Sequence, residues 1–127
     1  MPLVPFSNST RGDKFVTVDR LGRLCLSVGL RRELDCLTSP IDLYVAYDKV
    51  NQRIGLAKTH VVRLVGMRPY RFDRLRGYAY ARNFLKANQI PHGEPRRYNY
   101  IGREDPGWLT FQLAGYVAPD QPELPEI

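Results

Sequence analysis

The sequence predicts a mainly β protein with two short helices, in which one strand–turn–strand–helix–hairpin unit occurs twice. Three observations support this prediction. Apolar and polar residues alternate in short runs, as on strands that bury one face. Asp, Gly and Pro residues that favour turns separate these runs. The apolar pattern of the first half also reappears 54 or 55 residues later, which indicates an internal repeat.

The first unit spans residues 14–59 and opens with two strands joined by a tight turn. The turn, residues 19–22, begins with Asp and ends with Gly; Asp can bond its own backbone, and Gly tolerates positive φ. The next strand runs through Leu24 and Leu26. Ser27 can then cap a helix, because its oxygen accepts a bond from a free N–H at the helix start. The unit is completed by a helix through Leu30 and Leu34 and a hairpin of residues 41–47 and 52–58.

The second unit spans residues 70–115 and repeats this order with more aromatic residues. Asp73 falls at the place of Asp19, and the strand, helix and hairpin follow in step. Four tyrosines fall at places that are apolar in the first unit. We therefore predict that these tyrosines belong to the core rather than to base-stacking platforms. They are Tyr78, Tyr80, Tyr98 and Tyr100.

Three segments lie outside the two units. Residues 1–13 are predicted to be a flexible arm, residues 60–69 a linking strand, and residues 116–127 an acidic, Pro-rich and disordered tail. A unit of about 50 residues is marginal as an independent core, so each is expected to pair with another such unit. No apolar run approaches about 18 residues, and no membrane span is predicted.

The start of the chain lacks the basic region and long apolar core of a secretory signal, which predicts a cytoplasmic protein. A disulfide between Cys25 and Cys36 is not expected in that compartment. Zinc needs about four ligands, and only His60 and His92 could join the cysteines, without ligand-like spacing. Both cysteines are predicted to be core or near-core residues.

Arginine dominates the basic residues. Of the 19 Lys and Arg residues 15 are Arg, and all 19 precede Ala118, alongside ten of the 13 acidic residues. Arg can fork onto phosphates and guanine edges, where Lys is only a point charge. Residues 63–103 alone hold ten basic and two acidic residues. This balance suits a polyanionic partner, although many basic proteins have none.

Residues 18–32 read Val-Asp-Arg-Leu-Gly-Arg-Leu-Cys-Leu-Ser-Val-Gly-Leu-Arg-Arg. This stretch resembles the AbrB/SpoVT swapped-hairpin domain. The resemblance is carried by the Asp, the Gly-Arg pair, the alternating Leu residues and the helical Leu-Arg-Arg. The resemblance covers about residues 14–58, and Ser27 stands where the family usually has Pro. Two such halves in one chain resemble the MraZ family. The resemblance implies a swapped-hairpin (double-split) β-barrel of two β-β-α-β-β halves, and often a homo-oligomer.

The same resemblance implies a bacterial or phage transcriptional regulator that binds duplex DNA at the nucleoid. Phosphate contacts would supply affinity, and a few Arg residues at base edges would supply sequence choice. On the first helix, Arg31 and Arg32 are expected to point away from the apolar face. The predicted DNA-binding residues are Arg23, Arg31, Arg32, Arg74, Arg76, Arg82 and Lys86, with Arg20, Arg71, Arg96 and Arg97 as additional candidates.

Two other functions stay open. A phage or host accessory protein could use the same scaffold for protein–protein interaction, and an antitoxin is disfavoured because the tail after Gly115 offers little apolar surface. The sequence holds no nucleophile elbow, phosphate-binding loop or His-based metal motif. Asp19 and Asp73 could pair as acid and base, but an Asp that opens a turn beside an Arg is usually structural. No enzyme, cofactor or metal is predicted.

Overall fold

The computed structural model describes residues 13–62 and 64–120 and confirms a mainly β fold with two short helices. The helices are α1 (Val28–Glu33) and α2 (Arg82–Ala87). The strands are β1 (Phe15–Val18), β2 (Arg23–Leu26), β3 (Ile41–Asp48), β4 (Arg53–Lys58), β5 (Tyr70–Phe72), β6 (Tyr78–Tyr80), β7 (Arg96–Glu104) and β8 (Trp108–Leu113). The order strand–strand–helix–strand–strand therefore occurs twice within the described residues.

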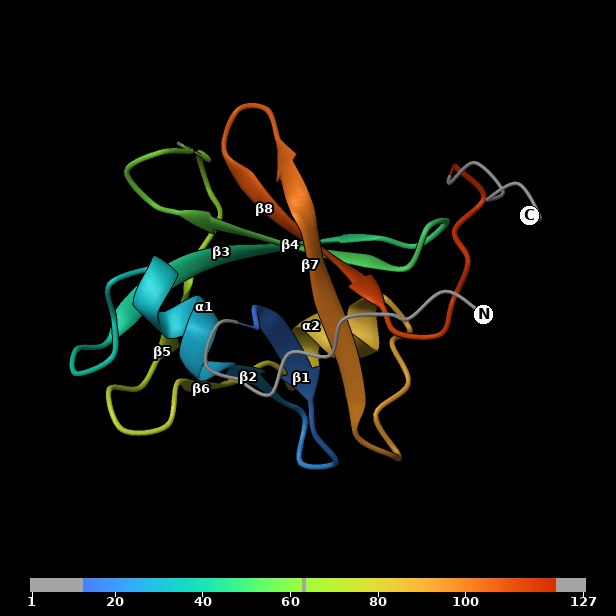
Figure 1. The fold of residues 1–127 in the computed structure, drawn as a ribbon, viewed down its shortest axis with the longest axis horizontal. Helices are drawn as coiled ribbons and strands as arrows, with labels where there is room; N and C mark the ends of the chain where they lie inside the picture. The colour runs from blue at the N-terminus through green and yellow to red at the C-terminus, as the bar shows by residue number, and fades with distance from the viewer. Residues whose placement is uncertain (1–12, 63, 121–127) are drawn as a thin grey trace, which may run out of the picture.

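The strands form one antiparallel sheet that curls into a nearly closed barrel. Its order is β5-β3-β4-β8-β7-β1-β2-β6, and the two end strands, β5 and β6, lie in contact. Figure 1 shows the long hairpins β3–β4 and β7–β8 crossing in the upper half of the molecule, with the short strands below them. Closure of the ring hides most strand edges, which would otherwise expose unpaired backbone groups.

Strands of the two units pair with one another in the sheet. β1 pairs with β7 and β5 pairs with β3, so the first strand of each unit lies beside the third strand of the other. Val16 lies opposite Tyr98, and Tyr70 lies opposite Leu43. These two pairs are equivalent after a shift of 54 to 55 residues. The remaining cross-unit pairs, β2–β6 and β4–β8, join equivalent strands directly. Each unit therefore takes some of its strand neighbours from the other and the rest from within itself.

Ser27 caps α1 as predicted. Its Oγ accepts the backbone N–H of Leu30 at 3.2 Å, which satisfies a helix-start donor. The same oxygen accepts the N–H of Phe15 and donates to the carbonyl oxygen of Asp13. The cap therefore ties the start of α1 to the start of β1, as well as ending the preceding strand.

The second turn is one residue longer than the first. In the first turn the N–H of Asp19 donates to the carbonyl of Arg23; in the second the N–H of Asp73 donates to the carbonyl of Tyr78. The additional residue lies between Asp73 and Tyr78, in the Leu75-Arg76-Gly77 part of the turn. Because side chains alternate between the two faces of a strand, one inserted residue exchanges the inward and outward positions of the strand that follows.

This insertion corrects the predicted core positions of Tyr78 and Tyr80. Ala79 and Ala81 are buried instead, whereas Tyr78 is half-buried and Tyr80 is 69% exposed. The prediction aligned β6 with β2 at a constant shift, which is wrong by one residue after the longer turn.

The core lies inside the barrel and draws on both units. Tyr98, Phe72 and Phe111 are the largest fully buried side chains. Tyr98 is a predicted core residue and is confirmed, and Tyr100 packs half-buried against the core. Cys36 is buried and Cys25 half-buried, both as free thiols. Burial raises the pKa of each thiol, that of Cys25 to about 12.

The segment between the two units differs from its prediction. Residues 60–62 and 64–69 form turns and irregular backbone, where a linking strand was predicted. β4 already has β3 and β8 on its two sides, so a strand directly after it finds no free edge there. The predicted arm lies outside the described residues except for Asp13, and the predicted tail is described as far as Asp120. Neither described helix is long and apolar enough to cross a membrane.

Candidate nucleic-acid interface

The β1–β2 and β5–β6 turns project from the same side of the molecule, the lower side of Figure 1. An Asp carboxylate organises each turn. Asp19 accepts the N–H groups of Leu21 and Arg23, and Asp73 accepts those of residues 75–78. Both turns therefore have a fixed backbone, with the carboxylates directed at backbone amides.

The two carboxylates are held in their charged form. Burial by itself raises the pKa of Asp19, but hydrogen bonds from the backbone and guanidinium of Arg23 outweigh it and hold that pKa below the usual range. The backbone N–H of Arg76 is the largest cause of the lowered pKa of Asp73. Hydrogen bonds to the charged form favour ionisation. Each carboxylate therefore stabilises the backbone of its own turn.

Arg31 of α1 is buried against the second turn, with 7% exposure. Its guanidinium donates to the carbonyl oxygens of Leu37 and Arg74, both at 2.8 Å, and to that of Leu75 at 3.4 Å. Its side chain crosses directly over Gly77, where an added Cβ would lie 2.9 Å from the Arg31 Cδ. The expected outward direction of Arg31 is therefore corrected, because the other unit's turn packs on that side of α1.

Arg82 of α2 makes the equivalent contact with the first turn. Its Nε donates to the carbonyl of Leu21 at 3.0 Å, and an added Cβ on Gly22 would lie 2.5 Å from the Arg82 Cγ. Backbone bonds beside the two turns are also reciprocal: the N–H of Ala81 donates to Gly22, and that of Leu26 donates to Gly77. Unlike Arg31, Arg82 stays exposed.

Arg23 is fixed by two neighbours. Its Nε lies 2.5 Å from a carboxylate oxygen of Asp19, and its guanidinium carbon lies 4.5 Å from the centre of the Tyr78 ring. Stacking on an aromatic face and pairing with a carboxylate both favour the planar Arg group. The side chain remains 23% exposed. One edge of a preorganised guanidinium therefore reaches solvent beside the first turn.

Exposed basic residues surround these contacts. Arg20 lies in the first turn, Arg74 and Arg76 lie in the second, and Arg32 follows the buried Arg31 on α1. The structure thus brings together basic residues that lie about 50 positions apart in the chain. We call this set the turn–helix surface; its members are Arg20, Arg23, Arg32, Arg74, Arg76 and Arg82. The remaining candidate, Lys86, is exposed in the last turn of α2, one helical turn beyond Arg82.

The other candidates lie on strands β5 and β7 rather than in the turns or on the helices. Arg71 on β5 pairs with Asp42 of β3, with Nε 3.0 Å from the carboxylate. Arg97 on β7 lies over the Phe15 ring, 3.6 Å from its centre. Arg96 begins β7 and is half-buried. Arg71, Arg96 and Arg97 are therefore not members of the turn–helix surface.

Sequence reasoning missed two features. Leu21 and Leu75, at the tips of the two turns, are 51% and 77% exposed. Their place inside a turn was the signal that could have predicted this exposure. The second feature is Arg53, whose side chain is buried in the β4–β8 ladder. An Arg at the start of a strand gives no sequence signal of such burial, since its partners come from residues about 60 positions away.

The fold and its site define a class of protein: a nearly closed, eight-stranded antiparallel barrel with two short helices and an Arg-rich turn side. Comparison of the chain with protein-family models, curated proteins and solved structures finds no match.

Proposed function

We propose that the protein binds duplex DNA through the turn–helix surface and acts as a transcriptional regulator. One observation carries the proposal: two rigid turns on one side of the barrel each present exposed Arg side chains, with the opposite unit's helix packed beside them. Rigid placement favours contacts with regularly spaced phosphates, because little side-chain or loop freedom is lost on binding.

The chain topology supports the finer part of this proposal. In a swapped-hairpin barrel of the AbrB type, two equivalent units interleave their strands. The pairings β1–β7 and β3–β5 are the interleaving expected if both units lie in one chain. We propose that the chain is such an internal pseudo-dimer. Its two turns differ by one residue, so the two ends of the turn–helix surface are unequal and would read DNA asymmetrically.

Roles within the surface follow from exposure. Arg20, Arg32, Arg74, Arg76 and Arg82 are assigned to phosphate or base contact. Arg31 is assigned to positioning, because its two terminal nitrogens donate to backbone carbonyls of the second turn and of the α1–β3 connection.

The test is fluorescence anisotropy of labelled duplex DNA with the full chain at low and near-physiological salt. We expect binding that weakens steeply with salt. Arg74→Ala with Arg76→Ala should weaken it further and lower the salt slope by about one for each phosphate that the variant no longer neutralises. Arg103→Ala is the control for a single charge outside the turn–helix surface: Arg103 is 67% exposed and pairs with Glu33 at 3.7 Å, and the β7–β8 hairpin that carries it projects from the opposite side of the molecule. Absence of binding at low salt would overturn the proposal, as would equal losses in Arg103→Ala.

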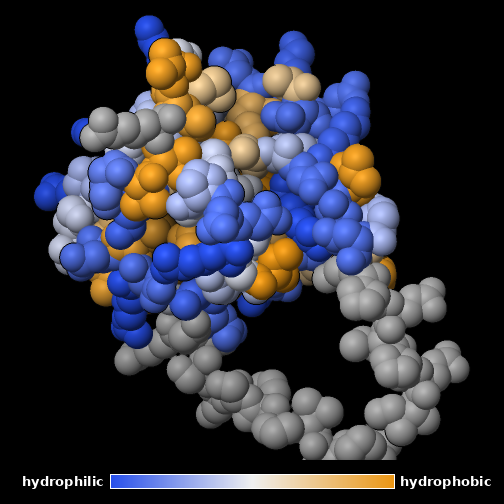
Figure 2. Space-filling view, turned by 90° about the horizontal axis from the view of Figure 1, so that it is seen from above, coloured by the Kyte–Doolittle hydropathy of each residue, from blue (hydrophilic) through white to orange (hydrophobic). Residues whose placement is uncertain are grey.

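Protein–protein interaction is the second candidate, and a separate surface favours it. Exposed apolar side chains lie in the β4–β5 connection and at the β7–β8 end: Val61, Val65, Met67 and Ile101. Figure 2 looks onto this end and shows apolar side chains gathered over part of it. An exposed apolar cluster favours a protein partner. Two results together would support this candidate: the wild-type chain binds no DNA, and the Arg74→Ala/Arg76→Ala variant still binds a protein partner.

A further inference from the structure

Arg53 is a charged side chain built into the sheet. It begins β4 beside Gln112 of β8, and its side chain is only 10% exposed. Its Nε donates to the Gln112 Oε1 at 2.8 Å. The Gln112 amide nitrogen in turn donates to the carbonyls of Asn51 and Gln52. Gln112 therefore fixes the direction of the guanidinium through groups that belong to the barrel itself.

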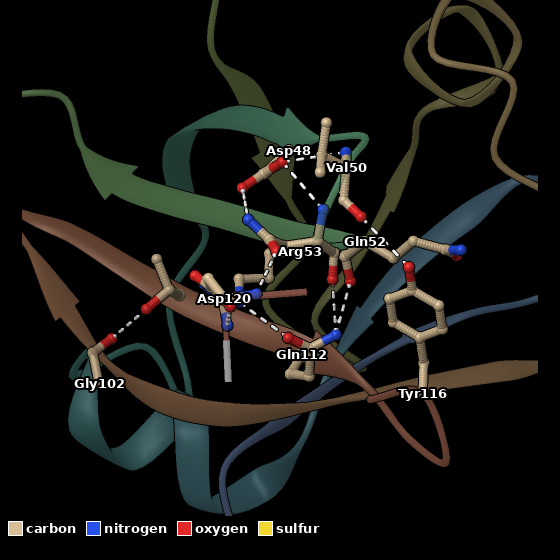
Figure 3. Close-up of polar contacts among 10 residues, drawn as sticks. Asp48, Val50, Gln52, Arg53, Gly102, Gln112, Tyr116 and Asp120 are labelled. Carbon is tan, nitrogen blue, oxygen red and sulfur yellow. Dashed lines mark hydrogen bonds and ion pairs between the residues drawn. The ribbon is translucent and has the colours of Figure 1, made fainter. Parts of the chain in front are cut away.

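The outer edge of this guanidinium holds one carboxylate. Its two terminal nitrogens lie 2.5 and 2.6 Å from the two oxygens of Asp120, as a bidentate pair. Figure 3 shows Arg53 between Gln112 on one side and Asp120 on the other. Asp120 belongs to the segment after β8 and is 47% exposed. The Arg53 guanidinium therefore belongs to the barrel, whereas the Asp120 carboxylate comes from the segment that follows the last strand.

The segment that brings Asp120 can be distinguished from the barrel. Gly115 follows β8 with φ of 79° and no atom within 4 Å of its Cβ position. The Tyr116 hydroxyl then donates to the carbonyl of Val50 at 3.2 Å, and Ala118 is buried. We call residues 114–120 the C-terminal strap. Because a buried Arg without an anion is strongly unfavourable, the guanidinium in this position favours a carboxylate partner.

Space for a ligand lies beside the same guanidinium. A cavity of about 220 Å³ is lined by Arg53, Tyr47, Trp108 and Thr110, together with the acidic Asp48 and Glu104. The Asp48 carboxylate already accepts the N–H groups of the β3–β4 turn. Because Asp48 and Glu104 line the cavity, a ligand with a second negative charge close to the bound carboxylate is disfavoured. The site therefore fits a single carboxylate flanked by neutral or basic groups, rather than a polyacidic segment.

We propose that Arg53 and Gln112 form a carboxylate-binding site, which the chain fills with its own Asp120 and which takes one Asp or Glu side chain of a partner peptide when the C-terminal strap is withdrawn. The site is independent of DNA binding, since it lies on the β4–β8 ladder rather than among the two turns. Its occupant is recognised by the same bidentate geometry that holds Asp120.

The first test is chemical rescue of the full-length Asp120→Ala variant. Acetate is the probe, compared with chloride at equal ionic strength, and the readout is the midpoint of thermal unfolding. A ligand that binds only the folded state raises this midpoint with concentration. We expect acetate to raise it in Asp120→Ala, but not in wild type or in Arg53→Met/Asp120→Ala. Equal shifts in the three proteins would overturn the proposal. Asp120→Asn replaces Asp120→Ala if the latter does not fold.

The second test uses a labelled peptide of residues 114–120 with an amidated carboxyl end, so that its Asp is its only carboxylate. Binding to the Asp120→Ala chain is expected to be at least about tenfold tighter than to wild type, and at least about tenfold tighter than that of a peptide with Asn in place of Asp. A peptide that binds Asp120→Ala and wild type equally, or whose Asn version binds equally well, would contradict the exchange of carboxylates.

Discussion

Arg31 of α1 lies across Gly77 of the second turn and donates to the carbonyl of Arg74, 43 positions away in the chain. Arg82 lies in the same way across Gly22 of the first turn. Each unit therefore completes the turn of the other. This reciprocal contact links the geometry of the turn–helix surface to the association of the two units.

Glycine at positions 22 and 77 is required for two separable reasons. Gly22→Ala and Gly77→Ala are each expected to lower the free energy of unfolding by about 1 to 2 kcal/mol, because an Ala at positive φ is strained. A further loss is expected because the new Cβ displaces the Arg side chain that crosses the turn, Arg82 over Gly22 and Arg31 over Gly77. Gly66→Ala and Gly115→Ala are the matched controls: both have φ near that of Gly22, with no atom within 4 Å of the Cβ position. Urea unfolding measures the difference. Equal losses at all four positions would show that the Arg contact contributes nothing.

Arg31 and Arg32 are neighbours with different roles. Arg31→Ala is expected to destabilise the fold by about 2 to 3 kcal/mol, because it leaves part-buried carbonyl groups without their donor. Arg32→Ala is expected to change stability by less than about 0.5 kcal/mol, since Arg32 is exposed. Chemical denaturation of the two variants checks this contrast. Similar stability losses would mean that the buried guanidinium is not what holds the second turn.

The Tyr98 hydroxyl lies in the core without a hydrogen-bond partner among the described residues. Burial raises its pKa to about 12. Tyr98→Phe removes this unpaired polar group and keeps the ring, so we expect stability to stay equal or to rise by about 1 kcal/mol. Tyr100→Phe, on the same strand and half-buried, is the comparison. A loss above about 1 kcal/mol in Tyr98→Phe would reveal a partner for the hydroxyl.

Acid should weaken both turns. The folded-state pKa values of Asp19 and Asp73 are lowered from 3.8, so their contribution is present above that value and is lost as pH falls through the folded pKa values. The Asp19→Asn/Asp73→Asn variant should therefore be less stable than wild type at pH 7, with the gap narrowing below about pH 4. Thermal unfolding against pH measures the gap, and Glu94→Gln, at an exposed loop position, is the control. A gap that does not depend on pH would contradict the charged role of these carboxylates.

The Ser27 oxygen serves both α1 and β1. Ser27→Ala is expected to lower the free energy of unfolding by about 1 to 2 kcal/mol, since the N–H groups of Leu30 and Phe15 lose their acceptor. Ser27→Thr keeps the oxygen and should retain most of the stability. Circular dichroism during urea unfolding distinguishes the two. A Thr variant as unstable as the Ala variant would point to packing rather than capping.

The sequence by itself determined the local structure. Alternation located the strands, the Asp–Gly turn and the Ser27 cap formed as predicted, and the repeat at 54 to 55 residues matches the element order. These features follow from interactions between residues close in the chain, such as the bonds from Leu21 and Arg23 to Asp19. The Arg residues of the two turns were also found from sequence, because turn positions are exposed.

The tertiary structure decided which face each side chain uses. Arg31 is buried because a turn from the other unit lies on α1, and Tyr80 is exposed because one added residue in the preceding turn reversed the two faces of β6. Arg53 meets Asp120 only when β4, β8 and the C-terminal strap come together. Periodicity shows that a strand or helix has an apolar face, but it does not show what packs on the other face. That depends on contacts between residues 40 to 70 positions apart, and only the folded chain brings them together.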